Sequence, residues 1–381
     1  MIPAFSFLPD GNIALPIGIS FYTFQLLSYV VDVYRGEVPA QKNVFTLLLY
    51  ASLFHQCIAG PIVRYRDVSE ELLYRKTNLR EIGEGVSRFA IGLAKKALLA
   101  NVCGELADSL LLLKSGTLSA AAIEASDGAA LWMSMICYTL QIYLDFSAYS
   151  DMAIGMGRMI GLHYKENFNY PYMAKSVREF WRRWHITLSA WFKDYLYIPL
   201  GGSRKGNMRT YVNLTIVFFL TGLWHGASWT FVVWGLLHGA FMVFERLGFD
   251  KVLDKSFKPL QHLYTLLVVF LAWVFFRADN LSYALHFIGQ MFNFAVTSNN
   301  ASFLLRYVQP SFIVVTIVAI VGSTNVFSLL NEKSKSFVRE GSRLMWNTRQ
   351  ICILLGIVGT LLGVTCFLVV GGYNPFIYFR F

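Results

Sequence analysis

The sequence predicts an all-α membrane protein that forms one domain over residues 1–381 and crosses the bilayer about nine times, with further interfacial or re-entrant helices around a cavity within the membrane. Of the 381 residues 55% are hydrophobic and only 15% are charged, against about 25% in a soluble globule. The mean hydropathy is +0.48, and apolar stretches recur along the whole chain instead of forming one signal segment. A soluble enzyme, a disordered chain and a secreted disulfide scaffold are therefore excluded.

Crossing a hydrocarbon core of roughly 30 Å takes about 20 mostly apolar residues. The stretches predicted as spans are 13–33, 44–63, 82–103, 129–160, 210–223, 227–245, 259–276, 303–330 and 350–372. The third carries Arg88, Lys95 and Lys96, so it is expected to face protein or water instead of lipid. Two aromatic segments of mixed polarity, 176–200 and 281–296, are predicted to lie in or dip into the interface.

Basic residues fall unevenly across the predicted loops. If 64–80 is cytoplasmic, alternation also places 161–209, 246–258 and 331–349 there, and the four segments hold 5, 9, 4 and 5 Lys and Arg. The loops on the other side hold only Arg35, Lys42, Lys114, Arg277 and Arg380. The formal charge of +10 is thus explained by topology, and no nucleic-acid partner is expected.

The segment 178–209 combines three Trp, seven basic residues, His185 and Asp194 with a Gly-rich turn. One interpretation is an amphipathic helix anchored at the cytoplasmic surface. The other keeps this anchor and adds an anion site, because guanidinium groups pair bidentately with phosphate. Coenzyme A and the phosphopantetheine arm of a carrier protein are two such anions. The residues expected to attract the anion are Arg182, Arg183, Arg204 and Lys205, and Asp194 is also expected to contribute to binding this donor substrate.

The segment 221–239 places a histidine at membrane depth. Residues 210–223 number 14 and reach roughly 21 Å as a helix, so the apex at Trp224, His225 and Gly226 is expected short of the far interface. A histidine there is a functional candidate, because a group with a pKa near 6.5 exchanges protons at neutral pH. The alternative is a structural histidine. His238, in the following helix, is expected to pack beside the site or support it.

Two acids, Asp145 and Asp151, lie in a predicted span rich in polar residues. Such a face is expected to turn toward the bundle interior or a wet cavity, where each acid forms an ion pair with Lys95, Lys96 or Arg158. Their six-residue spacing does not put them on one helix stripe, so no metal site or carboxylate dyad is expected. No GxSxG, HExxH, P-loop or Rossmann motif occurs in suitable context. A buried base beside a basic cytoplasmic entrance remains, and this combination fits group transfer.

Several motifs resemble those of the membrane-bound O-acyltransferases, and most closely the bacterial branch that O-acetylates alginate. They run in family order over essentially the whole chain, and FWRRWH followed by LWHG is a specific pair. The matching pieces are LPIGISFYTFQLLSYVVDVYRG (15–36), AGPIVRY (59–65), YLDFSAYSDMAIGMGRMIG (143–161), FWRRWHITLSAWFKDYLYIPLGGSRKG (180–206), GLWHGASWTFVVWGLLHG (222–239) and FIYFRF (376–381).

The resemblance implies that His225 is the catalytic histidine, with His185 as a second characteristic polar position, Trp224 lining the substrate site and the cavity serving catalysis. It implies a bacterial inner-membrane enzyme with a cytoplasmic acyl thioester as donor, acetyl-CoA or an acylated carrier. The acceptor would be an extracytoplasmic polysaccharide or a periplasmic acetyltransferase partner. No tightly bound cofactor and no metal are required. Members of this branch usually have further spans before LPIGISFYTF, which implies a truncated start or a short form.

Two other functions remain open from the sequence. D-alanyl transfer to teichoic acid is compatible with FWRRWH and LWHG, although the GLLHG and FIYFRF segments look nearer the polysaccharide acetylation branch. A transporter that relays protons through intramembrane His and Asp residues has the same composition and also uses discontinuous helices.

Overall fold

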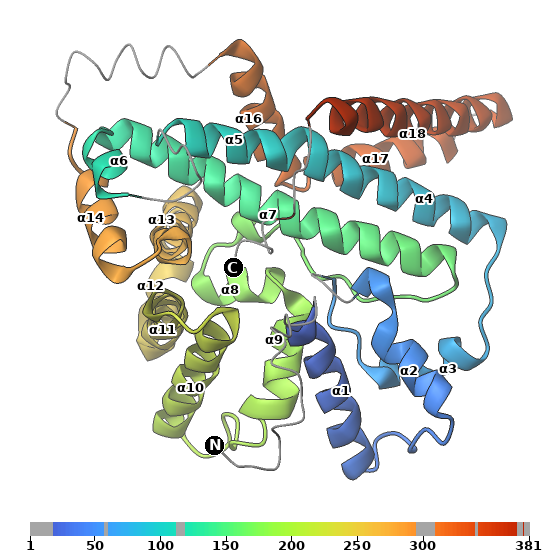
Figure 1. The fold of residues 1–381 in the computed structure, drawn as a ribbon, viewed down its shortest axis with the longest axis horizontal. Helices are drawn as coiled ribbons and strands as arrows, with labels where there is room; N and C mark the ends of the chain where they lie inside the picture. Colours follow the sequence, from blue (N-terminus) through green and yellow to red (C-terminus); the bar gives the residue numbers. More distant parts are fainter. Residues whose placement is uncertain are drawn as a thin grey trace, which may run out of the picture.

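The computed structural model describes residues 18–56, 60–111, 119–294, 309–339, 342–371 and 376. Every regular element in these ranges is a helix, which confirms the all-α prediction (Figure 1). The elements are α1 (Ile19–Tyr34), α2 (Val44–Ser52), η2 (Phe54–Gln56), α3 (Tyr65–Leu73), α4 (Leu79–Ala94), η3 (Lys95–Ala100), α5 (Asn101–Ser109), α6 (Ala120–Glu124), α7 (Gly128–Met159), η4 (Pro171–Met173), α8 (Val177–Arg183), α9 (Ile186–Phe192), η5 (Lys193–Tyr197), α10 (Asn207–His225), α11 (Trp229–Phe244), η6 (Glu245–Phe249), α12 (Asp250–Lys255), α13 (Lys258–Arg277), α14 (Leu281–Met291), α16 (Pro310–Gly322), α17 (Val326–Arg339) and α18 (Arg343–Gly371).

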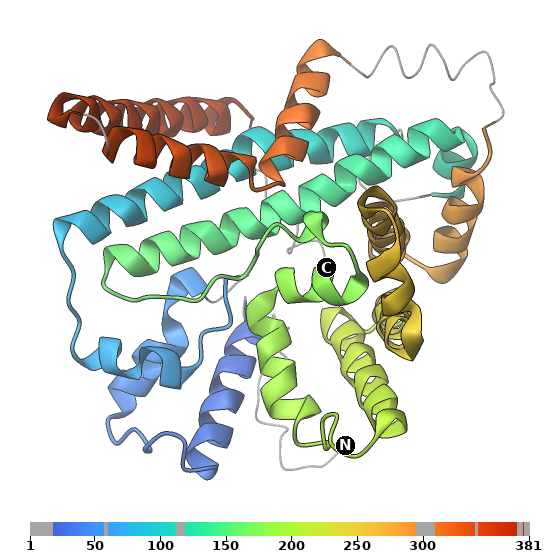
Figure 2. The same ribbon diagram turned by 180° about the vertical axis from the view of Figure 1, so that it is seen from behind.

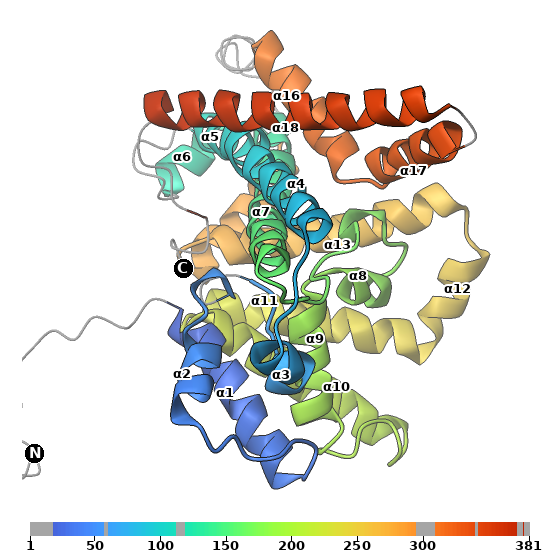
Figure 3. The same ribbon diagram turned by 90° about the vertical axis from the view of Figure 1, so that its right-hand side faces the viewer.

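A long helical pair forms the centre of the molecule. The run α4–η3–α5 lies side by side with α7 in both face-on views (Figures 1 and 2). Small residues allow this close approach: a Cβ on Gly85 would stand 2.6 Å from the Gly155 carbonyl oxygen, and one on Gly92 2.7 Å from that of Ala148. Helices α8 and α9 lie beside α7, and α18 crosses the outside of the bundle (Figure 3).

Helices α10 and α11 form a second close pair. A Cβ on Gly235 would stand 2.3 Å from the Phe218 carbonyl oxygen, and one on Gly222 would stand 2.4 Å from that of Phe231. The two backbones are therefore in contact, and this contact holds the end of α10 against α11.

Replacing Gly235 with leucine is expected to destabilise the protein by about 1–3 kcal/mol, because the added side chain must separate the two helices. Thermal unfolding in detergent measures the effect. Gly289→Leu is the matched control, since Gly289 is also in a helix and a Cβ there meets nothing within 4 Å. Equal unfolding temperatures for the two variants would contradict this account of the helix pair.

Fewer helices than predicted pass a test of length and apolar composition for membrane spans. Among the described residues three pass, Trp229–Lys255, Lys258–Arg277 and Arg343–Val369, or four if one bent helix pair counts as a single span. Nine spans are therefore not confirmed. Helices α4 and α7 are not among those that pass, and charged side chains pair inside the bundle between α7 and η3, which continues α4.

The predicted span 303–330 is wrong as one helix. Over its described part, α16 and the helix that follows it meet at an angle of 67°. The predicted span 210–223 is too short, because α10 begins at Asn207 and runs for 19 residues, about 28 Å. Hydropathy missed its polar first turn, and the depth of the apex below the far interface stays a prediction.

The predicted span 44–63 does not cross the bundle. Helix α2 has only nine residues. The chain then turns back, because the Tyr50 hydroxyl donates to the Val63 carbonyl at 2.8 Å and Gln41 donates to the Tyr65 hydroxyl at 2.8 Å. The loop 35–43 therefore lies at the same end as the segment from residue 64 onward, not at the opposite end as alternation predicted.

Two of the other three predicted cytoplasmic loops, 161–209 and 246–258, do meet at this end. Lys165 pairs with Asp67 at 2.5 Å, which joins the second loop to the first. Arg178 pairs with Asp250 at 3.2 Å, which joins the third loop to the second. These pairs agree with the grouping of the basic loops on one face.

The aromatic segment 176–200 is not one interfacial helix. It breaks between α8 and α9 at His185, which has a left-handed backbone with φ 44°. Trp181, Trp184 and Trp191 are buried against the large apolar cluster around α7 or the smaller one beside α1. The aromatic residues that suggested a bilayer anchor instead bind the segment into the protein.

Candidate active site

His225 is the last residue of α10, and its imidazole lies among aromatic rings. The ring centroid is 4.7 Å from that of Trp224, 5.0 Å from Trp234 and 5.2 Å from Phe276. Trp234 and Phe276 are themselves buried in the main apolar cluster. His225 therefore packs against protein. It is also partly exposed, so that a substrate can reach it.

His185 begins α9 and is almost completely buried, with 1% of its surface exposed. Its left-handed backbone is uncommon for a residue with a side chain, although histidine tolerates it better than most. The imidazole packs on Phe146 at 4.8 Å and on Phe21 at 6.4 Å. A strained, buried histidine at a helix junction is typical of a functional position.

The two histidines lie next to the same indole. The centroid of the Trp224 ring lies 4.7 Å from that of the His225 ring and 6.3 Å from that of the His185 ring. Within the described chain, Nε2 of His185 and Nε1 of Trp224 are buried without a hydrogen-bond partner. The site therefore holds an unused acceptor or donor on the imidazole and an unused donor on the indole.

Asn167 is a site residue that the sequence analysis missed. Its Oδ1 lies 3.1 Å from Nδ1 of His185, and its backbone carbonyl accepts from Ile186 N–H at 2.9 Å. Asn167 is 1% exposed. The available signal was a polar residue in the aromatic run ENFNYPY, close before FWRRWH.

His238 is fully buried next to this site. Its ring contacts Trp234 at 5.3 Å, and Trp234 in turn contacts His225. Neither ring nitrogen of His238 has a partner among the described residues. His238 therefore touches the wall of the site but not His225, which agrees with the expected packing or supporting position.

Glu245, at the end of α11, joins this helix to the start of α8. Its carboxylate accepts from the backbone N–H groups of Val177 at 2.6 Å and Arg178 at 2.9 Å, at the start of α8. A carboxylate there satisfies donors that a helix N-terminus leaves unpaired. No pattern in the sequence indicates this contact.

The two acids of α7 form the expected ion pairs. Lys96 Nζ lies 2.5 Å from Asp145, and Lys95 Nζ lies 2.6 Å from Asp151. Arg88 also contacts Asp151 at 2.9 Å. The third partner considered from the sequence, Arg158, pairs with Glu84 at 3.2 Å instead.

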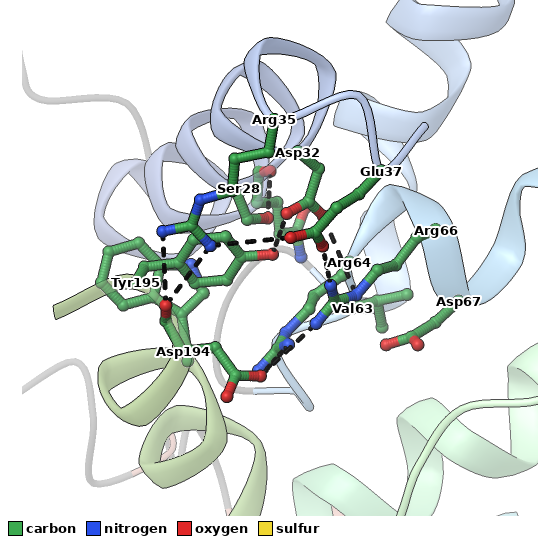
Figure 4. Close-up of polar contacts among 12 residues, drawn as sticks. Ser28, Asp32, Arg35, Glu37, Val63, Arg64, Arg66, Asp67, Asp194 and Tyr195 are labelled. Carbon is green, nitrogen blue, oxygen red and sulfur yellow. Dashed lines mark hydrogen bonds and ion pairs between the residues drawn. The ribbon is translucent and has the colours of Figure 1, made fainter. Parts of the chain in front are cut away.

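Asp194 belongs to a charged cluster where η5 meets α1 and α3 (Figure 4). Its carboxylate lies 2.6 Å from the buried Arg64 and 3.4 Å from Arg66, and its backbone carbonyl accepts from Arg35. The neighbouring Tyr195 hydroxyl donates to Asp32 at 2.7 Å. This geometry gives Asp194 a role in holding η5 in place, and the predicted donor-binding role stays a prediction.

The four predicted anion-binding residues differ in whether they already have a charged partner. Arg183 is occupied by Glu179 at 2.7 Å and by the Asn169 carbonyl at 3.0 Å. Arg182 is exposed on α8, and Arg204 and Lys205 are exposed on the turn before α10. In the described part of the chain these three make no ion pair.

No group of three or more His, Cys, Asp or Glu side chains suited to a metal ion occurs within the described ranges. The chemistry that the site offers is that of imidazole nitrogens in an aromatic, largely water-excluded setting.

The profile of the MBOAT, membrane-bound O-acyltransferase family matches residues 38–288, and the chain belongs to this family. It is 44% identical to the probable alginate O-acetylase AlgI of Azotobacter vinelandii, over 74% of this chain and 55% of that protein. It is 35% identical to the peptidoglycan O-acetyltransferase of Helicobacter pylori, over 97% of this chain and 75% of that protein. With the teichoic acid D-alanyltransferase of Bacillus subtilis it shares 26% identity over 61% of this chain and 60% of that protein. The chain spans about half the length of the alginate relatives it matches.

Proposed function

We propose that this protein is an O-acyltransferase that moves an acetyl group from a cytoplasmic thioester to a hydroxyl of a cell-envelope polysaccharide or of a partner acetyltransferase. The observation that carries the proposal is the placement of His225 and His185 next to the same residue, Trp224. Membership of the acyltransferase family and similarity to proteins named O-acetylases support it.

His225 acts as the general base in this proposal. The acceptor oxygen attacks the thioester carbonyl while its proton passes to an imidazole nitrogen of His225, and the thiolate then leaves and takes up that proton. General base assistance contributes about 10²–10⁴ in rate. The products are an acetyl ester and a free thiol, so the reaction needs neither an oxidant nor a metal.

The donor enters from the face that gathers the basic loops. The exposed Arg182, Arg204 and Lys205 attract its phosphates, while the occupied Arg183 holds α8. The acceptor approaches from the other face, so that the acyl group crosses the bacterial inner membrane without its hydrophilic carrier.

Acetyl transfer is favoured over D-alanyl transfer, because identity to the alginate O-acetylases is 44% and to the teichoic acid D-alanyltransferase 26%. Purified protein incubated with acetyl-CoA labelled in the acetyl group tests the proposal. Label on a polysaccharide hydroxyl together with an equal amount of free thiol is the expected result. Label transfer only from a D-alanyl carrier, or no transfer with either donor, would overturn it.

A further inference from the structure

The hydrogen bond between His185 and Asn167 leaves open which ring nitrogen carries the proton. Nδ1 of His185 lies 3.1 Å from Oδ1 of Asn167, and Nε2 has no partner in the described part of the chain. A neutral imidazole has one N–H and one lone pair, and the partner of one nitrogen decides the state of the other. The orientation of the Asn167 amide therefore decides which ring nitrogen of His185 carries the proton.

Neighbouring groups determine that orientation. The Thr187 backbone N–H, which can only donate, points at Asn167 Oδ1 at 3.3 Å. The Thr187 hydroxyl accepts from Ile62 N–H at 2.9 Å and donates to the same Oδ1 at 2.8 Å. On its other side, Nδ2 of Asn167 donates to the Ser150 hydroxyl at 3.2 Å. Turning the amide over would set its N–H group against another N–H group, so Oδ1 must be the atom that faces His185.

An oxygen acceptor at that position requires a proton on Nδ1. We propose that Asn167 is a positioning residue that keeps His185 in the Nδ1–H tautomer, so that Nε2 presents a lone pair to the site beside Trp224 and His225. Nε2 then accepts a hydrogen bond from an incoming hydroxyl or from an N–H of His225. Because Nε2 carries no proton in this tautomer, it cannot donate a hydrogen bond to a thioester carbonyl. Nε2 of His185 therefore acts only as an acceptor.

The backbone makes this arrangement rigid. Asn167 accepts from Ile186 N–H at 2.9 Å through its carbonyl, and Asn169 N–H donates to the Arg183 carbonyl at 2.9 Å. The left-handed backbone of His185 turns its ring toward Asn167 between these two bonds. Asn167, His185 and Ser150 are each 2% exposed or less, so water does not compete for the amide.

Nitrogen NMR of the full chain in detergent, labelled with ¹⁵N-histidine, tests the tautomer directly. The His185 signals are assigned by their loss in His185→Gln. The expected spectrum shows a protonated Nδ1 and an unprotonated Nε2 for His185, and Asn167→Leu is expected to remove this pattern. A proton on Nε2 in the unaltered protein would overturn the proposal.

A set of variants tests the consequence for transfer, which rests on the proposed function. Asn167→Leu is expected to lose about 10²–10⁴ in rate, whereas Asn167→Asp, whose carboxylate still accepts from Nδ1–H, keeps activity within about tenfold. Thr187→Val removes the hydroxyl donor to Oδ1 and keeps the backbone N–H donor, so it is expected to lose less activity than Asn167→Leu. Asn169→Leu is the matched control, because Asn169 is exposed and its hydrogen bonds in the described structure come from its main chain.

Two outcomes contradict a positioning role: Asn167→Asp as inactive as Asn167→Leu, or Thr187→Val as inactive as either. The first would mean that the acceptor atom is not what matters, and the second that the loss comes from general loosening of the segment. If the unaltered protein transfers no acyl group, the proposed function fails while the NMR result still decides the tautomer.

Discussion

His225→Ala is expected to lower acetyl transfer by about 10²–10⁴, because it removes the imidazole that takes the acceptor proton. The protein level and the unfolding temperature should remain close to those of the unaltered protein, since His225 is only partly buried and makes ring contacts at the edge of the main cluster. Release of free thiol and labelling of a hydroxyl acceptor, measured together, give the effect.

His286→Ala is the matched control for this experiment. His286 is a partly exposed histidine on α14, outside the site, and its replacement should leave transfer unchanged. If His225→Ala keeps most of the activity at equal protein level, the assignment of the base is wrong.

Asp145→Ala is expected to lower the free energy of unfolding by roughly 3–5 kcal/mol, because it leaves the ammonium of Lys96 buried without the carboxylate. The side chains of Lys96 and Asp145 are 8% and 2% exposed, and their atoms lie 2.5 Å apart. Removing one partner of a buried ion pair destabilises a protein much more than removing one partner of an exposed pair. Chemical unfolding in detergent micelles measures the loss.

The exposed pair of Lys335 and Glu332 offers the comparison, since Glu332→Ala should change the unfolding free energy by less than about 0.5 kcal/mol. The double replacement Lys96→Met with Asp145→Leu should recover much of the loss, because no charge is then buried. Equal losses for Asp145→Ala and Glu332→Ala would show that the pair between α4–η3 and α7 does not stabilise the bundle.

Two long helices could be predicted from the sequence to within a residue or two, whereas α18 begins at Arg343, seven residues before the predicted span 350–372. The span predicted at 129–160 is α7, Gly128–Met159, and the one at 259–276 is α13, Lys258–Arg277. Prediction failed at 44–63, where hydropathy does not distinguish one crossing helix from two short ones. There the deciding feature is the long-range bond from Gln41 to Tyr65, which no local pattern reveals.

The candidate site could be predicted only in part, because some of its contacts are also long-range. His225 and His185 stand in short motifs that are visible along the chain. Asn167 lies 18 residues before His185, and Glu245 lies 68 residues after Val177. Both act through hydrogen bonds that exist only after the break at His185 and the α10–α11 hairpin have formed.

The central claim is that the acyl group reaches a hydroxyl on one side of the membrane from a thioester on the other, through His225. Proteoliposomes with labelled acetyl-CoA outside and a polysaccharide acceptor sealed inside measure this directly. The account predicts acetyl ester on the enclosed acceptor with the unaltered protein, and at most about one hundredth as much with His225→Ala. Equal labelling with both proteins, or labelling only when the acceptor is placed outside with the donor, would contradict it.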